Sequence, residues 1–341
     1  MINIAVVGFG YWGPNLVRNF SQLEHCTVKS IVETNAGRRS TAQKLYPQIP
    51  TMPSFDAVIS DPHIDAIVLA VPVSAHFPLA KAALLGGKHV LLEKPMTDSA
   101  EHARELIDLA QRQQKVLMVD HTFLYTGAIK KIKELTSKGE IGEMQYFDSV
   151  RINLGLFQHD SNVLWDLAAH DISMLEYLEA EPIQSVVATG ISHTPNRIEN
   201  IAYLTAYYQS NKIAHFTLSW TSPVKIRKIL IGGTRKMLVY DDLEPTEKVK
   251  VYDTGFSMNS EDSTNSYEER NKILVDYRVG DAYIPKIEMG EALRGMAADF
   301  IRSIREGTEP TANAQSGLSV VRILEAADRS LRNRGQEVML T

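Results

Sequence analysis

The 341-residue sequence contains a single cysteine, Cys26. An intrachain disulfide is therefore impossible, and a zinc site built from several cysteines is excluded. An excess of basic residues is also lacking: the formal net charge is −5, which gives no electrostatic reason to expect nucleic acid or an anionic membrane as a partner. No apolar run approaches the roughly 20 residues that a membrane-spanning helix needs. The first three residues lead into an apolar strand without the basic segment of a signal peptide, so we expect a cytoplasmic protein.

Internal repeats and low-complexity tracts are absent from the sequence. Its most polar window, residues 257–272, is typical of a long surface loop. Hydrophobic residues make up 44% of the chain and charged residues 23%, which is the balance of a globular protein and not of a disordered one. The length favours two domains, and the change of pattern described below predicts them at residues 1–122 and 123–341.

The N-terminal segment combines an apolar run with a glycine motif. Residues 4–7 predict a strand covered on both faces, and Gly8, Gly10 and Gly13 follow as G-x-G-x-x-G before a stretch with helical spacing. The first glycine permits a tight turn, the second lets a pyrophosphate approach the backbone, and the third lets the helix lie close to the strand. Free N–H groups at the helix start favour phosphate binding. We therefore predict a dinucleotide-binding site.

A carboxylate supports this prediction. Residues 28–32 predict the second strand, and Glu33 at its C-terminal end is placed to accept hydrogen bonds from the ribose hydroxyls of the cofactor. An acid in a solvated loop is the simpler interpretation, but the upstream glycines favour binding. Because Glu33 would repel a 2′-phosphate, NAD is the expected cofactor. Arg38 and Arg39 follow closely and are able to pair with a 2′-phosphate, so NADP stays the alternative.

Strands and helices continue to alternate up to residue 121, which predicts a parallel, doubly wound α/β sheet of the Rossmann type. In such sheets, ligands bind outside the carboxyl ends of the strands. The ends predicted here are Val71-Pro72, Glu93-Lys94-Pro95 and Asp120-His121. The apolar run at 90–92 is followed by the charged pair Glu93-Lys94 and a proline. A strand that served only to build a core would end in turn residues. We therefore expect Glu93 and Lys94 to lie in the cleft.

After residue 122 the pattern changes to short alternating strands joined by polar turns, with a helix near 127–138 and two closing helices near 291–305 and 317–332. This predicts an α/β domain with a large, mostly antiparallel open sheet. One further helix, at 163–180, carries Asp166 and His170 four residues apart and so on one face. We expect Asp166 to orient the His170 ring and to raise its pKa. The alternative is an acid that stabilises the helix start and a histidine satisfied by local hydrogen bonds.

Three motifs in this order, G-x-G-x-x-G at Gly8 to Gly13, Glu93-Lys94-Pro95, and Asp166-x-x-x-His170, resemble the Gfo/Idh/MocA oxidoreductase family over essentially the whole chain. Residues 162–178 and 277–288 are similar to a branch that oxidises the 3-hydroxyl of a UDP-N-acetylglucosamine-type nucleotide sugar. The resemblance implies a homodimer or homotetramer formed through the open sheet. It also implies that Lys94 hydrogen-bonds the reacting hydroxyl and that Asp166 and His170 lie across the substrate. Ala168 stands where many members carry a glycine.

Oxidation of a secondary alcohol requires a hydride acceptor, a base and positioning. Lys94 is the base if the cleft keeps it neutral; otherwise it stabilises the alkoxide as a cation and His170 accepts the proton, which is the arrangement we favour. Glu93 is expected to orient Lys94 or the carboxamide of the cofactor. The predicted cofactor-binding set is completed by Tyr11, Trp12, Val71, Pro72, His76 and His121.

Two other classes of function are weaker interpretations. A regulator that binds a dinucleotide without catalysis would need none of Lys94, Asp166 and His170. A metal-dependent hydrolase built on the His159-Asp160 and His170-Asp171 pairs would need several more converging ligands, so no metal is predicted. An inositol or a free sugar is the alternative substrate.

Overall fold

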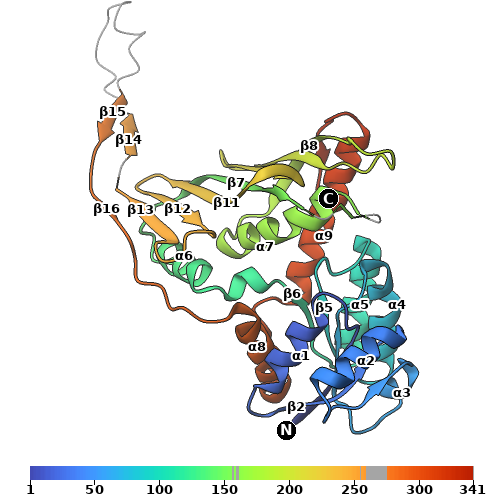
Figure 1. Ribbon diagram of the computed structural model, residues 1–341. Coiled ribbons are helices and arrows are strands. Elements are labelled where there is room, and N and C mark those ends of the chain that lie inside the picture. Colours follow the sequence, from blue (N-terminus) through green and yellow to red (C-terminus); the bar gives the residue numbers. More distant parts are fainter. Residues whose placement is uncertain (156, 159–160, 254, 259–274, 341) are drawn as a thin grey trace, which may run out of the picture.

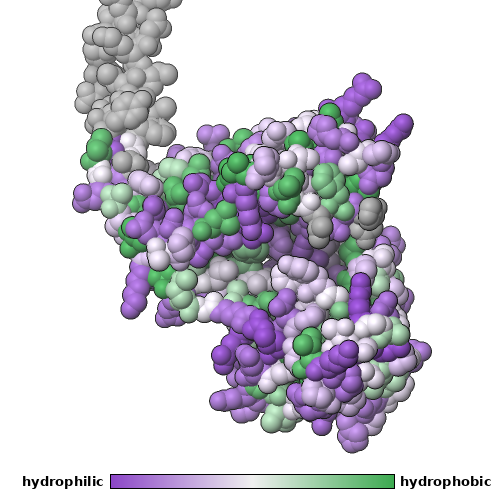
Figure 2. Space-filling view, in the orientation of Figure 1, coloured by the Kyte–Doolittle hydropathy of each residue, from purple (hydrophilic) through white to green (hydrophobic). Residues whose placement is uncertain are grey.

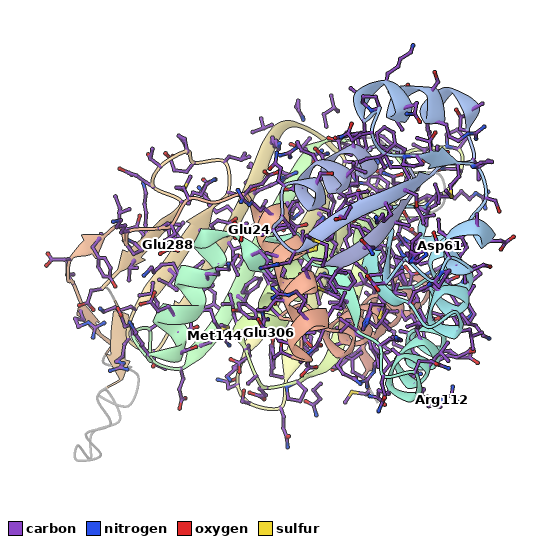
Figure 3. The ribbon with its side chains drawn as sticks, turned by 90° about the horizontal axis from the view of Figure 1, so that it is seen from below. Glu24, Asp61, Arg112, Met144, Glu288 and Glu306 are labelled. Atoms are coloured by element: carbon purple, nitrogen blue, oxygen red, sulfur yellow. The ribbon has the colours of Figure 1, made fainter. Side chains whose placement is uncertain are left out.

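The computed structural model describes residues 1–155, 157–158, 161–253, 255–258 and 275–340. Most of the predicted surface loop at 257–272 and the whole His159-Asp160 pair lie outside the described residues. Seen from below, the molecule is elongated, with Asp61 and Arg112 toward one end and Glu288 toward the other (Figure 3). Among the described residues, no helix is both long and apolar enough to cross a membrane.

The first domain is a six-stranded parallel sheet in the order β3-β2-β1-β4-β5-β6. This is the strand order of a doubly wound dinucleotide-binding fold, and the predicted Rossmann domain is confirmed. Its elements are β1 (Ile2–Val7), α1 (Gly13–Ser21), β2 (Cys26–Val32), α2 (Ala36–Leu45), β3 (Thr51–Met52), α3 (Asp56–Ile59), β4 (Ala66–Leu69), η1 (Val73–Ala75), α4 (His76–Leu85), β5 (His89–Glu93), α5 (Ala100–Arg112) and β6 (Leu117–Asp120).

Helices cover both faces of this sheet, which explains its continuous apolar strands. Leu16, Val17 and Phe20 of α1 pack on one face with Ile4 and Val6 of β1. Side chains of α4 and α5 build a separate core on the other face. The order of strands reverses between β1 and β4, so a crevice opens there at their carboxyl ends.

The second domain is a nine-stranded sheet in the order β16-β13-β12-β11-β7-β10-β9-β8-β17. Among the strands that the structure describes, only β7 and β10 of this sheet pair in parallel, so the predicted mostly antiparallel sheet is confirmed. Its elements are η2 (Thr122–Tyr125), α6 (Gly127–Ser137), β7 (Met144–Leu154), η3 (Leu164–Ala168), α7 (Ala169–Leu178), β8 (Ile183–Ile191), β9 (Ile201–Tyr208), β10 (Ile213–Ser219), β11 (Thr221–Gly233), β12 (Met237–Asp241), β13 (Val249–Tyr252), β16 (Ala282–Tyr283) and β17 (Val338–Met339). A separate hairpin of β14 (Gly255–Met258) and β15 (Val275–Arg278) projects away from the sheet (Figure 1).

The two closing helices join the domains. Helix α8 (Ala292–Glu306) returns to the Rossmann domain, where Phe300 meets Phe20 edge-on at 6.4 Å and Glu291 pairs with Arg18 at 2.5 Å. Helix α9 (Ala314–Arg332) runs from β6 and α5 up to β8 of the second domain (Figure 1). These helices are thus shared by both cores, and the division at residues 122 and 123 stays a prediction.

The predicted helix at 163–180 has an unexpected beginning. Its first turn, η3, is a π-helical segment, and a regular α-helix follows only from Ala169. Turns of this kind are wider than an α-helix and are frequent at functional sites. Asp166 lies in the middle of this turn, and His170 lies in the first turn of α7.

Candidate active site

A cavity of about 1430 Å³ lies at the carboxyl ends of β1, β2, β4 and β5 and extends to loops of the second domain. The space-filling view shows the molecule hollowed between the two domains (Figure 2). Most predicted site residues line this cavity: Gly8, Gly10, Tyr11, Trp12, Glu33, Val71, Pro72, Glu93, Lys94 and Asp166. Gly13, His76, His121 and His170 are not among its lining residues.

The glycine loop has the geometry that the motif predicts. Gly8 has a φ of +95°, and a Cβ there would lie 2.2 Å from the carbonyl oxygen of Ala70. A Cβ on Gly13 would lie 2.3 Å from the carbonyl oxygen of Gly8, so this glycine permits the close helix–strand contact. Above Gly10, by contrast, the nearest atom is Nη1 of Arg38, 3.8 Å from the Cβ position. The loop therefore leaves open space for a phosphate beside its backbone.

Glu33 has a role in the loop that its position in the sequence did not reveal. Its Oε2 accepts a hydrogen bond from the backbone N–H of Phe9 at 2.8 Å, and its Oε1 accepts one from the N–H of Asn35, also at 2.8 Å. Each carboxylate oxygen has a second lone pair that remains available to a ribose hydroxyl. Glu33 thus holds the glycine loop in place while it faces the cavity.

Lys94 is bound to Asp166 across the two domains. Its Nζ donates to the main-chain oxygen of Asp166 at 2.7 Å and to Oδ1 of the carboxylate at 3.1 Å. The other carboxylate oxygen, Oδ2, accepts a hydrogen bond from Nε1 of Trp220 at 3.0 Å. The peptide bond between Lys94 and Pro95 is cis. Both Lys94 and Asp166 face the cavity, so an ammonium group with its counter-ion stands at the carboxyl end of β5.

The expected effect of Asp166 on His170 is wrong. Both oxygens of the Asp166 carboxylate bind Lys94 and Trp220, and Nδ1 of His170 is buried without a hydrogen-bond partner among the described residues. The pKa of His170 is well below its usual value, because burial and then the charges of Lys94 and Arg151 disfavour the imidazolium. Its ring lies 5.0 Å from that of Phe123, edge-on. His170 is therefore neutral at neutral pH. Lys94 occupies the position beside Asp166 that was expected for His170.

Two predicted cofactor contacts have a different position. His76 is almost fully buried, and its ring nitrogens face the carbonyl oxygens of Val71 at 2.9 Å and Pro95 at 3.0 Å. It therefore connects the ends of β4 and β5 beneath the cavity and does not line it. His121 is also fully buried, and burial lowers its pKa to about 4. Neither of its ring nitrogens has a partner among the described residues.

A buried ion pair fixes the start of α7. Asp171 accepts two hydrogen bonds from Nε of Arg151 at 3.0 Å each and one from Nη2 at 2.6 Å. The guanidinium of Arg151 also lies 4.6 Å from the ring centre of Phe123, the residue that packs against His170. Asp171 thus anchors α7 to β7. In the part of the chain that the structure describes, no group of three or more His, Cys, Asp and Glu side chains is suited to hold a metal ion.

Several residues of the site carry no signal in the sequence. Trp220 follows β10 and reaches Asp166 only through the fold of the sheet. The second domain also contributes Asn162 and Arg197 to the cavity, and the end of α9 contributes Arg332. These residues belong to loops and a helix end that are distant in sequence from every motif, so local spacing could not identify them.

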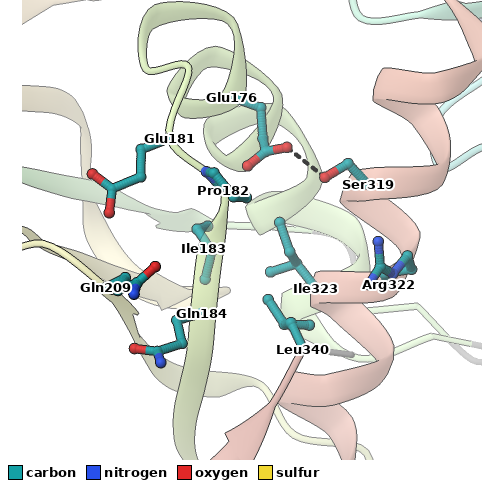
Figure 4. Close-up of a pocket in the computed structure, with 10 residues that line it drawn as sticks. All are labelled: Glu176, Glu181, Pro182, Ile183, Gln184, Gln209, Ser319, Arg322, Ile323 and Leu340. Carbon is teal, nitrogen blue, oxygen red and sulfur yellow. Dashed lines mark hydrogen bonds between the residues drawn. The ribbon is translucent and has the colours of Figure 1, made fainter.

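A second, smaller cavity of about 250 Å³ lies between α7, β8 and α9 (Figure 4). It is lined by side chains of α7, β8 and α9, among them Ser319, whose hydroxyl donates a hydrogen bond to Glu176. Burial raises the pKa of Glu176. No predicted site residue reaches this cavity.

The fold and the large cavity define a dinucleotide-dependent oxidoreductase of the Rossmann type. Residues 2–121 match the family model described as "Oxidoreductase family, NAD-binding Rossmann fold", and residues 129–239 match the "GFO/IDH/MocA C-terminal domain". An uncharacterised oxidoreductase of Schizosaccharomyces pombe is 31% identical over 361 residues, covering 96% of this chain and 97% of its own. The chain belongs to the Gfo/Idh/MocA oxidoreductase family, and its cofactor is NAD.

Two further relatives have described activities. The scyllo-inositol 2-dehydrogenase (NADP(+)) of Bacillus subtilis is 23% identical, covering 98% of this chain and 94% of its own. The UDP-N-acetylglucosamine 3-dehydrogenase of Acidithiobacillus ferrooxidans superposes with a TM-score of 0.82 at 20% identity, covering 98% of this chain and 99% of the other. At this identity, the second comparison describes a shared fold.

Proposed function

We propose that the protein oxidises a secondary hydroxyl of a sugar, and that this sugar is a nucleotide sugar of the UDP-N-acetylglucosamine type, oxidised at its 3-hydroxyl. The observation that carries the proposal is the Lys94 ammonium, held by two oxygens of Asp166 at the wall of the cavity. When bound, NAD supplies the hydride acceptor. The residues that would hold it are the glycine loop, Glu33 and the strand ends at Val71-Pro72 and Glu93.

Lys94 and His170 have complementary protonation states for this chemistry. An ammonium has three donors, and two of those of Lys94 are committed to Asp166, which leaves the third for the substrate hydroxyl. As a cation, Lys94 stabilises negative charge that develops on the hydroxyl oxygen. His170 is neutral and so is able to accept the proton. Acid–base assistance of this kind is typically worth about 10²–10⁴-fold in rate.

The size and lining of the cavity favour a large substrate. Binding pockets for small molecules usually measure about 300–1,000 Å³, and this cavity of about 1430 Å³ offers room for a nucleotide sugar beside the cofactor. Arg197 and Arg332 line its wall on the second-domain side and suit a diphosphate. The similarity to the UDP-N-acetylglucosamine 3-dehydrogenase supports the same substrate class. An inositol or a free sugar is the second candidate, favoured by the scyllo-inositol dehydrogenase among the relatives.

The test is a substrate panel in which UDP-sugars, dTDP-sugars, inositols and free hexoses are each combined with NAD and NADP, with the absorbance of the reduced cofactor as readout. Lys94→Met should retain the affinity for NAD while turnover falls by about 100-fold or more. Lys81→Met, at an exposed position in α4, is the matched control. Near-normal turnover by Lys94→Met would exclude the role given to this residue.

We also propose that the protein is a homodimer or homotetramer assembled through the outer face of the second-domain sheet. Tyr203, Tyr207 and Ile213 of β9 and β10 are 45%, 38% and 43% exposed, and Tyr207 pairs with Ile213 across the two strands. Large apolar side chains grouped on a sheet favour burial by a partner. Sedimentation of a monomer at micromolar concentration would contradict this assembly.

A further inference from the structure

Two carboxylates lie at the carboxyl ends of neighbouring parallel strands, close to the large cavity. Glu93 ends β5 and Asp120 ends β6, and the two residues are directly paired in the sheet. In parallel strands, residues paired in this way project from the same face of the sheet. Glu93 lines the cavity together with Lys94, whereas Asp120 is only 3% exposed. We call these two residues the carboxylate pair.

The carboxylate pair has no cation of its own. Both described hydrogen bonds of the Lys94 ammonium go to Asp166, which neutralises it. Asp120 accepts a hydrogen bond from the hydroxyl of Thr122, a neutral donor. Oε1 of Glu93 is shielded from solvent and has no hydrogen-bond partner among the described residues. A buried carboxylate oxygen without a partner is costly, so its place beside a binding cavity points to a ligand.

The other titratable groups around the pair are neutral. Burial lowers the pKa of His121, which follows Asp120, and that of His170 on α7. Burial raises the pKa of Tyr125 in η2, so its hydroxyl stays protonated. Lys94 lowers the pKa of both carboxyl groups, but burial has the larger effect on each and raises it. The neighbourhood therefore contains two carboxyl groups, and the cation nearest to them is bound to Asp166.

Two adjacent carboxyl groups in such surroundings cannot both ionise at neutral pH, because burial and mutual repulsion disfavour the second charge. Burial raises the pKa of Asp120 to about 6. Burial and the charge of Asp120 raise the pKa of Glu93 well above its usual range. The pair as a whole therefore holds one proton until a positive charge arrives.

We propose that the carboxylate pair of Glu93 and Asp120 is the counter-ion for the oxidised nicotinamide ring, releasing its shared proton when NAD⁺ binds and keeping it when NADH binds. The oxidised ring carries one positive charge and the reduced ring carries none. The pair thus favours the oxidised cofactor, and it takes up a proton after hydride transfer has removed the positive charge. This inference holds for any sugar that the protein oxidises, because it concerns the cofactor alone.

The proposal fixes the sign of a pH dependence. Below the pH at which the pair loses its shared proton, NAD⁺ must expel that proton in order to bind. Its dissociation constant should therefore rise by about tenfold for each unit by which the pH falls, while that of NADH stays constant. Above that pH the pair is already ionised, and the dissociation constant of NAD⁺ should become independent of pH.

The test is calorimetric titration of the cofactor-free protein with NAD⁺ and with NADH, in buffers that differ in ionisation enthalpy, from about pH 6 to about pH 9, the range that spans the raised pKa values of such pairs. The wild type should release up to one proton per NAD⁺ and none per NADH. Glu93→Gln removes the carboxyl group that holds the proton and should lose the release at neutral pH. Asp120→Asn removes the charge that adds to burial in raising the pKa of Glu93, so its release should move to lower pH. Glu176→Gln removes another buried carboxyl group with a raised pKa, at the distant cavity of Figure 4, and should leave the release unchanged.

Equal proton release with both cofactors, or release with an unchanged pH dependence in both variants, would overturn the proposal. Circular dichroism checks that each variant is folded, and either variant alone is sufficient for the comparison with Glu176→Gln. Since no turnover is measured, failure of the substrate panel would leave this result intact. Failure of the proton balance would likewise leave the sugar oxidation intact.

Discussion

The ion pair between Arg151 and Asp171 should be among the most valuable single interactions of the second domain. Its side chains are 4% and 1% exposed, and three hydrogen bonds of 3.0, 3.0 and 2.6 Å join them. In Asp171→Asn, the negative charge is lost and one acceptor oxygen is replaced by an NH₂ group that faces the donors of Arg151. The guanidinium then stays buried without the carboxylate that faces it in the wild type, and one amide oxygen and the ring of Phe123 remain as described contacts. Removing one partner of a buried pair costs about 3–5 kcal/mol in the free energy of unfolding.

Urea unfolding followed by tryptophan fluorescence measures this cost, because Trp165 and Trp220 both belong to the second domain. The control is Glu134→Gln, which removes a carboxylate with equally short contacts of 2.5 and 2.6 Å to Lys131 and Lys138 at the surface of α6. Solvent replaces those contacts readily, so the control should lose far less stability. If Asp171→Asn were no more destabilising than Glu134→Gln, the reasoning from burial would be refuted. Replacing both partners, as Arg151→Met with Asp171→Leu, should cost less than Asp171→Asn alone, since no buried charge is left unpaired.

Three further predictions concern the cavity. Glu33→Ala should weaken NAD binding in a fluorescence titration and reduce the preference for NAD over NADP, since it removes a negative charge and an acceptor of the glycine loop. A wild type that prefers NADP by about tenfold would show that Arg38, and not Glu33, selects the cofactor. Trp220→Phe should lower kcat/KM by about 10- to 150-fold, because it removes a hydrogen bond to a charged group worth about 1.5–3 kcal/mol. It should have little further effect in an Asp166→Asn background. The rate of oxidation should decrease with falling pH only below about pH 6.5, because the lowered pKa keeps His170 neutral above that pH. His170→Ala should abolish this decrease. An unchanged decrease in that variant would show that another group accepts the proton.

The sequence was sufficient to predict the helices and strands that depend on residues close together along the chain. The apolar run of β1 followed by Gly8, Gly10 and Gly13 determines a strand, a tight turn and a helix through contacts within a few residues of each other. The alternation of strands and helices up to residue 121 determined the parallel sheet for the same reason. Strand ends were less certain: β4 ends at Leu69 and not at Val71, because Pro72 offers no N–H and the chain turns into η1.

The sequence could not show which partner a polar or charged side chain contacts. His76 was expected at the cofactor, but three carbonyl oxygens surround its ring beneath the cavity. The contacts of Trp220 and Arg151 likewise depend on how the strands of the second domain are ordered. Such contacts join residues 20 to 72 positions apart, and spacing along the chain carries no information about them.

Asp166 illustrates both points: its place on a helix is visible in the sequence, and its partner in the cavity is not. Spacing placed Asp166 and His170 on one helix face, yet the acid lies in a π-helical turn at the end of β5, where an ammonium competes for it. Lys94 prevails because a cation bound to a carboxylate in a partly buried site gains more than a neutral imidazole would. The consequence is a separation of roles: Asp166 binds the side-chain nitrogen of Lys94, and burial together with the charge of Lys94 keeps His170 neutral. In the mechanism that we propose, a single carboxylate thereby supports both the cation that stabilises an alkoxide and, through that cation, the neutral base that receives the proton.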